Sequence, residues 1–269
     1  TSQSYSFMPA GFEGYSFYSG KSGYYYDYGG YDGEYYDYDY SYGYRNTLYE
    51  GFGVLDSNGM YMISEKINPK ETSSPVLLTY SATVKSASGQ EITRSTNMVY
   101  HPEKTYVGIK SSKYVFDDAN PPVLSIVSVD EAGKYVKGLE CSLIVVCEKY
   151  ISVKKTGTYG RTFWESNYIQ DTVILDNVKI SGGNVDYKIK EKMQTGYYFV
   201  HAKYSVNGNN HLVSENFYYA GKDEGWWQVR DDNYIEVIPD KKSGEYEIGD
   251  RAKVLVKAPF KNLNGYVTI

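Results

Sequence analysis

Apolar and polar residues alternate with a period of two along short stretches of this chain. Between residues 80 and 85, for example, Tyr80, Ala82 and Val84 alternate with serine, threonine and lysine. That period is typical of a β-strand, because successive side chains point to opposite faces of a sheet. The stretch is therefore predicted to be an antiparallel strand with one buried face.

Other stretches of the same kind follow along the chain, separated by Gly, Asn and Asp residues that favour turns. Hairpins are predicted for residues 51–55 with 60–63, for 77–84 with 91–99, and for 197–206 with 211–219. Single strands are predicted at residues 106–109, 123–129, 139–146, 173–175, 178–180 and 185–189. Helical periodicity is nearly absent, so we expect an all-β protein of tandem antiparallel β-sandwich domains.

Three domains are expected. Residues 1–103 should form part or all of one sandwich, residues 104–222 a complete second one, and residues 232–269 the first strands of a third. The sequence stops on a strand-like stretch, and a sandwich cut there would leave a sheet edge unpaired. This favours a fragment, or a domain completed by a neighbouring domain or another chain.

Tyrosine is concentrated near the N-terminus, where residues 14–44 form a low-complexity block of Tyr, Gly, Asp, Glu and Ser. The whole chain has 33 tyrosines, and 15 of them lie in the first fifty residues. The block has almost no Leu, Ile or Val, so alone it is expected to be mobile. It is read as a Tyr/Gly-rich insertion.

The composition argues against several classes of function. A net charge of −5 and no visible cluster of Lys and Arg disfavour a nucleic-acid partner. No apolar run approaches eighteen residues, so no transmembrane segment is predicted. Cys141 and Cys147 lie about 20 Å apart on one predicted strand, too far for a mutual disulfide, and are expected to be buried free thiols. No catalytic motif or metal-ligand spacing is found, so we expect no enzyme, no cofactor and no metal.

The C-terminal stretch carries the clearest motif. It reads Asp240-Lys241, then Tyr246, Gly249-Asp250, Ala252, Val254, Val256 and Pro259-Phe260. Ala252, Val254 and Val256 are predicted to be the buried face of a strand. The motif resembles the signature that opens one macroglobulin-like domain in the bacterial alpha-2-macroglobulin family.

Further motifs lie N-terminal to this one, in the order expected of the family. They are Gly51-x-Gly53 with Leu55-Asp56-x-x-Gly59, Tyr80-x-Ala82-x-Val84 with Ser88-Gly89, Tyr106-Val107-Gly108-Ile109, Gly196-Tyr197-Tyr198, and Phe217-Tyr218-Tyr219-Ala220-Gly221 with Trp226-Trp227. The resemblance implies macroglobulin-like domains of an extracytoplasmic endopeptidase inhibitor, whose partners are trapped proteases. The sequence departs from the family by two extra residues before Tyr246 and by Ile248 where proline is common. Neither cysteine begins the family's thioester motif, so this stretch is not expected to bind a protease covalently.

Two sets of residues are candidates for a functional role. The first is a segment exposed to proteases, a bait, with tyrosines Tyr24, Tyr25, Tyr26, Tyr35, Tyr36, Tyr38 and Tyr40. A contact patch or inert insertion is favoured over the bait, because baits of the family are expected in or after the domain that begins near Asp240. The second set is expected to pack at a domain junction and comprises Trp226, Trp227, Tyr218, Tyr219 and Phe260. The alternative function is a bacterial cell-surface adhesive or structural protein with stacked β-sandwiches and a tyrosine-rich contact surface.

Overall fold

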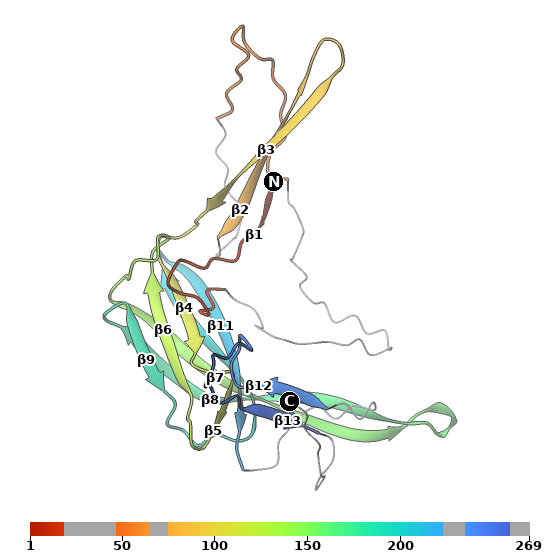
Figure 1. Cartoon of the computed structure of the whole chain (residues 1–269), viewed down its shortest axis with the longest axis vertical. Helices are drawn as coiled ribbons and strands as arrows, with labels where there is room; N and C mark the ends of the chain where they lie inside the picture. The colour runs from red at the N-terminus through yellow and green to blue at the C-terminus, as the bar shows by residue number, and fades with distance from the viewer. Residues whose placement is uncertain (19–46, 65–74, 223–234, 259–269) are drawn as a thin grey trace.

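The computed structural model describes residues 1–18, 47–64, 75–222 and 235–258 of the chain. Within these ranges the regular structure is almost entirely β-strand, with a single turn of 3-10 helix and no α-helix. Figure 1 shows a central body of two sheets from which two long ribbons project. The predicted all-β class of several antiparallel sheets is confirmed. Nothing in the described part of the chain is a helix capable of spanning a membrane.

The central body is a β-sandwich of two sheets. The larger sheet has the strand order β5-β11-β10-β7-β8, and the smaller has the order β4-β6-β9. Their bounds are β4 Tyr106–Ser111, β5 Val115–Asp117, β6 Val123–Val129, β7 Leu139–Thr156, β8 Thr162–Ile180, β9 Asn184–Lys188, β10 Gly196–Val206 and β11 Asn209–Ala220. All neighbouring strands are antiparallel except β5, which runs parallel to β11. Both sheets contribute apolar side chains to one core, including Val107, Leu124, Leu143, Val200 and Phe217.

A two-residue turn joins β10 to β11 and sets their register. Val206 pairs with Asn209, so the turn consists of Asn207 and Gly208. Both have positive φ, at 51° and 83°. These values suit the right-handed twist of a hairpin, and asparagine and glycine tolerate them best. The predicted hairpin is confirmed, with a shorter turn than the sequence suggested.

The hairpin of β7 and β8 is much longer than predicted. Its strands have 18 and 19 residues and stay paired from Leu139–Ile180 to Thr156–Thr162. The first half of β7 lies in the core, whereas the distal part projects from the sandwich as a two-stranded ribbon (Figure 1). The sequence predicted three separate short strands in this region, because the distal residues show no buried face.

The N-terminal sheet has the order β1-β2-β3, with bounds β1 Ser2–Ser4, β2 Val76–Lys85 and β3 Glu91–Tyr100. The predicted β2–β3 hairpin is confirmed. Its predicted buried face is wrong, because every residue from 80 to 85 is exposed, including Tyr80 and Val84. Figure 1 shows this end of the hairpin extending away from the body, where no other described sheet covers it.

Residues 7–17 near the N-terminus also pack on the central sandwich. Phe7, Phe12 and Phe17 form an aromatic cluster with Tyr106 of β4 and with valines of β6. Gly108 is part of this packing, because a Cβ there would lie 2.6 Å from the ring of Phe17. Glycine is favoured at this position of the Tyr106–Ile109 motif because a side chain there would clash with Phe17. The cluster also connects residues of the predicted domain 1–103 to the predicted domain 104–222.

The predicted hairpin at residues 51–63 is only partly present. A turn forms at residues 56–59, where the Asp56 carboxylate accepts hydrogen bonds from the N–H groups of Asn58 and Met60 at 2.9 and 2.8 Å. The flanking residues are not strands, and Phe52 and Val54 are 101% and 89% exposed. The local turn chemistry is strong, but no other described strand pairs with these residues.

The last described element is a ribbon of β12 (Glu236–Pro239) and β13 (Val254–Lys257). The predicted orientation of β13 is wrong. Val254 and Val256 are about half exposed, whereas Leu255 and Lys257 lie on the covered face and Lys257 is 5% exposed. Lysine occupies that face because β12 offers it the Glu236 carboxylate and the sandwich offers it two tyrosine rings, as described below.

Both cysteines lie in the core of the sandwich as free thiols, as predicted. Burial raises the pKa of the Cys141 thiol to about 11. The thiolate is the reactive form, so this thiol is expected to be unreactive in the folded protein.

Candidate interdomain junction

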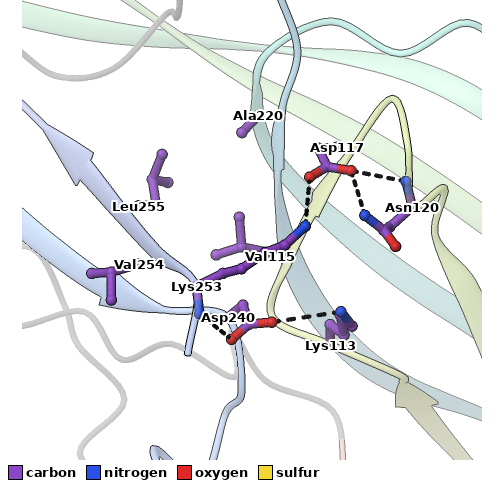
Figure 2. Close-up of a pocket in the computed structure, with 9 residues that line it drawn as sticks. All are labelled: Lys113, Val115, Asp117, Asn120, Ala220, Asp240, Lys253, Val254 and Leu255. Carbon is purple, nitrogen blue, oxygen red and sulfur yellow. Dashed lines mark hydrogen bonds and ion pairs between the residues drawn. The ribbon is translucent and has the colours of Figure 1, made fainter. Parts of the chain in front are cut away.

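Asp240 is the centre of the contact between the β12–β13 ribbon and the sandwich. It follows Pro239, the last residue of β12, and it is 6% exposed. Its carboxylate accepts hydrogen bonds from the Tyr246 hydroxyl at 2.8 Å and from the Lys253 N–H at 3.3 Å. It also lies 3.5 Å from the Lys113 ammonium, between β4 and β5 of the sandwich (Figure 2).

The backbone of Asp240 holds the two parts together as well. Its carbonyl accepts a hydrogen bond from the N–H of Tyr114 at 2.9 Å, and its N–H donates to the carbonyl of Lys253 at 2.9 Å. Burial raises the pKa of the Asp240 carboxyl, but hydrogen bonds from Tyr246 and Lys253 and the charge of Lys113 outweigh this, so the pKa is lowered. Asp240 is therefore held as a carboxylate at neutral pH.

A second ion pair crosses the same contact. The Lys253 ammonium lies 3.3 Å from the Asp117 carboxylate at the end of β5. Asp117 in turn accepts hydrogen bonds from the backbone and side-chain nitrogens of Asn120, both at 2.8 Å. The Asn120 bonds and Lys253 lower the pKa of the Asp117 carboxyl. Figure 2 shows these groups around a small cavity of about 150 Å³, between β5 and the ribbon.

Two more lysines of residues 236–257 pack against the larger sheet, Lys242 partly exposed and Lys257 buried. Lys242 forms an ion pair with Glu215 of β11, whose side chain is 3% exposed. Burial lowers the pKa of Lys242 to about 7. The side chain of Lys242 is 30% exposed, so the pair lies at the edge of the contact.

Lys257 is more deeply enclosed. Its ammonium lies 2.6 Å from the Glu236 carboxylate and donates a hydrogen bond to the Tyr197 hydroxyl. It also lies 4.2 Å and 4.6 Å from the ring centroids of Tyr197 and Tyr218. Burial lowers the pKa of Lys257 and Glu236 raises it, with burial the larger effect. The two tyrosine rings attract the cation because their faces carry negative charge.

The structure places two of the five predicted junction aromatics. Tyr218 is buried, and its ring lies 5.0 Å from that of Tyr197. Tyr219 points into the core, with its hydroxyl donating to Asp118 at 2.6 Å. Trp226, Trp227 and Phe260 lie outside the described residues. All seven candidate bait tyrosines, Tyr24, Tyr25, Tyr26, Tyr35, Tyr36, Tyr38 and Tyr40, lie outside them too.

Another polar cluster, not predicted from the sequence, joins the N-terminal sheet to the sandwich. Glu103 follows β3, is buried, and accepts hydrogen bonds from the side-chain amides of Asn207 and Asn209 at 3.0 and 2.7 Å. His211 of β11 lies 3.5 Å from the same carboxylate. The Asn-Gly turn that ends β10 thereby also fixes the linker between two parts of the chain.

The described residues contain no arrangement with evident catalytic chemistry. One Ser–His pair exists, with the His201 Nδ1 2.8 Å from the Ser214 hydroxyl, but Ser214 is 2% exposed and its N–H is bonded to the carbonyl of Tyr18. At this burial a substrate could not reach that hydroxyl in the folded protein. Groups of His, Cys, Asp or Glu able to hold a metal are absent from the part of the chain described.

Comparisons with known proteins gave structural matches only. No family model matches the chain, and no curated protein matches it. The chain resembles solved structures of bacterial alpha-2-macroglobulins. The native E. coli alpha-2-macroglobulin is 18% identical, with a TM-score of 0.41 over 76% of this chain. Salmonella alpha-2-macroglobulin reacted with methylamine is 20% identical, with a TM-score of 0.38 over 76% of this chain.

A point mutant of Salmonella alpha-2-macroglobulin matches 96% of this chain at 17% identity and a TM-score of 0.44. The chain spans only 14 to 16% of these alpha-2-macroglobulin structures.

Proposed function

We infer that this chain is a non-catalytic, extracytoplasmic structural part of an alpha-2-macroglobulin-like broad-spectrum protease inhibitor. In such a protein, protease cleavage of a bait would let the domains rearrange and trap the protease. The role of this chain would be to hold successive β-sandwiches in a defined arrangement. The sequence motifs from Gly51 to Phe260, in the family's order, support the family.

The observation that carries the proposal is the polar junction around Asp240. Apolar contacts are tolerant of sliding, whereas buried charges with fixed partners favour one relative position of two bodies, a specificity role we propose here for the junction. Four charged side chains of the ribbon segment have partners on the preceding sandwich: Asp240 with Lys113, Lys242 with Glu215, Lys253 with Asp117, and Lys257 with Tyr197 and Tyr218. Asp240 begins the motif that resembles the start of a macroglobulin-like domain, so the junction lies where two domains would meet.

The test uses the longest protein that contains this chain, incubated with chymotrypsin. A trapped protease keeps its activity toward a small chromogenic peptide but loses activity toward a large protein such as casein. We expect both effects at equimolar inhibitor. A protease inhibited on neither substrate would instead favour the adhesive or structural alternative, in which the exposed ribbons are contact surfaces.

A further inference from the structure

Glu103 is a buried acidic residue whose charge no lysine or arginine of the described residues balances. It lies in the linker between β3 and β4, and its side chain is 4% exposed. Its two oxygens accept hydrogen bonds from the side-chain amides of Asn207 and Asn209 at 3.0 and 2.7 Å. Lys104, its neighbour in the chain, is exposed. The carboxylate is therefore solvated by neutral amides, and burying a charge in this way is costly.

One nitrogen of a histidine faces this carboxylate. His211 Nε2 lies 3.5 Å from Glu103 Oε1, which is longer than a normal hydrogen bond. The His211 side chain is 3% exposed, and its Nε2 is buried without a hydrogen-bond partner in the part of the chain described. A charge-assisted N–H···O bond is about 2.7 to 2.9 Å long, so a movement of less than about 1 Å would close the contact.

The ring of Tyr204 completes the surroundings of His211. Tyr204 of β10 pairs directly with His211 of β11, and their rings are stacked with centroids 5.0 Å apart and planes at 22°. Burial, with a smaller contribution from the charge of Glu103, raises the pKa of Tyr204 to about 12, so this tyrosine stays neutral. Because the face of an aromatic ring attracts a cation, an imidazolium at His211 would meet both a carboxylate and a favourable ring.

We propose that Glu103 and His211 form a pH-sensitive latch between the N-terminal sheet and the sandwich. Imidazole takes up a proton between about pH 5 and pH 8, and at His211 that proton converts a loose contact into a buried ion pair. At higher pH the linker is held by the two asparagine amides alone. At lower pH the ion pair adds to them and holds the linker more tightly. The latch does not depend on the protease-inhibitor function proposed above.

A second histidine, in the linker itself, acts in the opposite direction. The Tyr106 hydroxyl accepts a hydrogen bond from the Glu103 N–H at 3.3 Å and lies 3.2 Å from His101 Nδ1. Burial raises the pKa of Tyr106, so its hydroxyl keeps its proton and suits a neutral His101 ring that accepts it at Nδ1. Burial lowers the pKa of His101, and the charge of Glu131 partly offsets this. Since the folded value is the lower one, stability is lost at His101 as the pH falls below the unfolded value of about 6.5.

The test is hydrogen exchange of the full chain at about pH 7.5 and about pH 5.5, with protection measured relative to unstructured peptide at the same pH. The readout is the amides of residues 100–106, which include the Glu103 N–H. The reference protein is H101Q, because glutamine keeps an acceptor for the Tyr106 hydroxyl and does not titrate. Hydrogen bonds to charged groups are among the strongest in proteins, so protection in H101Q should be about tenfold higher at the lower pH.

Two variants remove one member of the pair each. H101Q/H211Q and H101Q/E103Q should show no such rise. Glutamine at position 211 can still donate an N–H to the carboxylate, so H211Q tests the proton rather than the hydrogen bond. The matched control is H101Q/H201Q, which removes the third histidine of the chain, bonded to Ser214 on β11, and should keep the full rise.

Urea unfolding at neutral pH checks that each variant is folded, and if H101Q/E103Q is not, H101Q/H211Q decides alone. No rise in H101Q would overturn the proposal, because the contact would then not respond to a proton. A rise that persists in H101Q/H211Q would overturn it as well, because the proton would then lie on another group.

Discussion

The ion pair of Lys242 and Glu215 gives the sharpest test of the junction. Lys242→Met keeps the length of the side chain but removes the cation, which leaves the Glu215 carboxylate buried with the N–H of Asn216, at 2.7 Å, as its closest donor. Removing one partner of a buried pair typically costs about 3 to 5 kcal/mol. Because the Lys242 side chain is 30% exposed, we expect the lower end, about 3 kcal/mol.

Replacing both partners should largely restore stability. In K242M/E215M no charge is left buried, and an apolar pair of similar volume is often neutral, so we expect a free energy of unfolding within about 1 kcal/mol of the wild type. The double-mutant cycle would then give a coupling energy of about 2 kcal/mol or more. Lys179→Met, at an exposed ion pair with Glu140, is the matched control and should cost less than about 0.5 kcal/mol.

The assay is urea unfolding of the full chain, combined with hydrogen exchange of residues 236–257 followed by mass spectrometry. The exchange rates of these amides report on the ribbon separately from the rest of the protein, because the ribbon can detach before the sandwich unfolds. Wild-type exchange in K242M, or single-variant costs that simply add in K242M/E215M, would show that the pair does not hold the ribbon on the sandwich.

The other predictions concern pH, the β10–β11 turn and the core. The pKa values of Asp240 and Asp117 are lowered in the folded protein, so their stabilisation is present above the unfolded value near pH 4 and is lost as the pH falls through the folded values. Below about pH 4 the protection of the ribbon amides, measured relative to the exchange rate of unstructured peptide at the same pH, should therefore fall, and it should fall less steeply in Asp240→Asn. Gly208→Ala should destabilise the protein by about 1 to 2 kcal/mol in urea unfolding, because φ is 83° although the space beside it is open; an unchanged midpoint would contradict the turn assignment. Cys141 and Cys147 should resist Ellman's reagent in the folded chain and react at once in urea, and rapid reaction in buffer would contradict a packed core.

The sequence predicted a strand well where its hydrophobic pattern arose only from burial in the core. Residues 123–129 form β6 as predicted, because most of that strand is buried. The outer half of the β7–β8 hairpin was missed because neither face is buried, so hydrophobicity carries no period there. The orientation of β13 was wrong for a related reason, since Lys257 is buried against tyrosines that lie about 40 to 60 residues earlier.

The junction itself was only partly predictable. Tyr218 was singled out from its motif, and its described contacts include the Lys257 ammonium and the Tyr197 ring. The partners of Asp240 and Lys242 come from β11 and from the segment before β5, and no local pattern links positions so far apart. An acidic residue at the start of a motif signals a turn from sequence alone. Its role in joining two parts of the chain requires the tertiary structure.

Compaction on cleavage tests the proposed function most directly. The longest protein containing this chain would be treated briefly with chymotrypsin, and its radius of gyration would be followed by small-angle X-ray scattering on a size-exclusion column. A trap whose domains are held by fixed junctions should become more compact, and protease should elute with it. If the cleaved protein keeps its original radius of gyration and the protease elutes separately, the chain is not part of a protease trap.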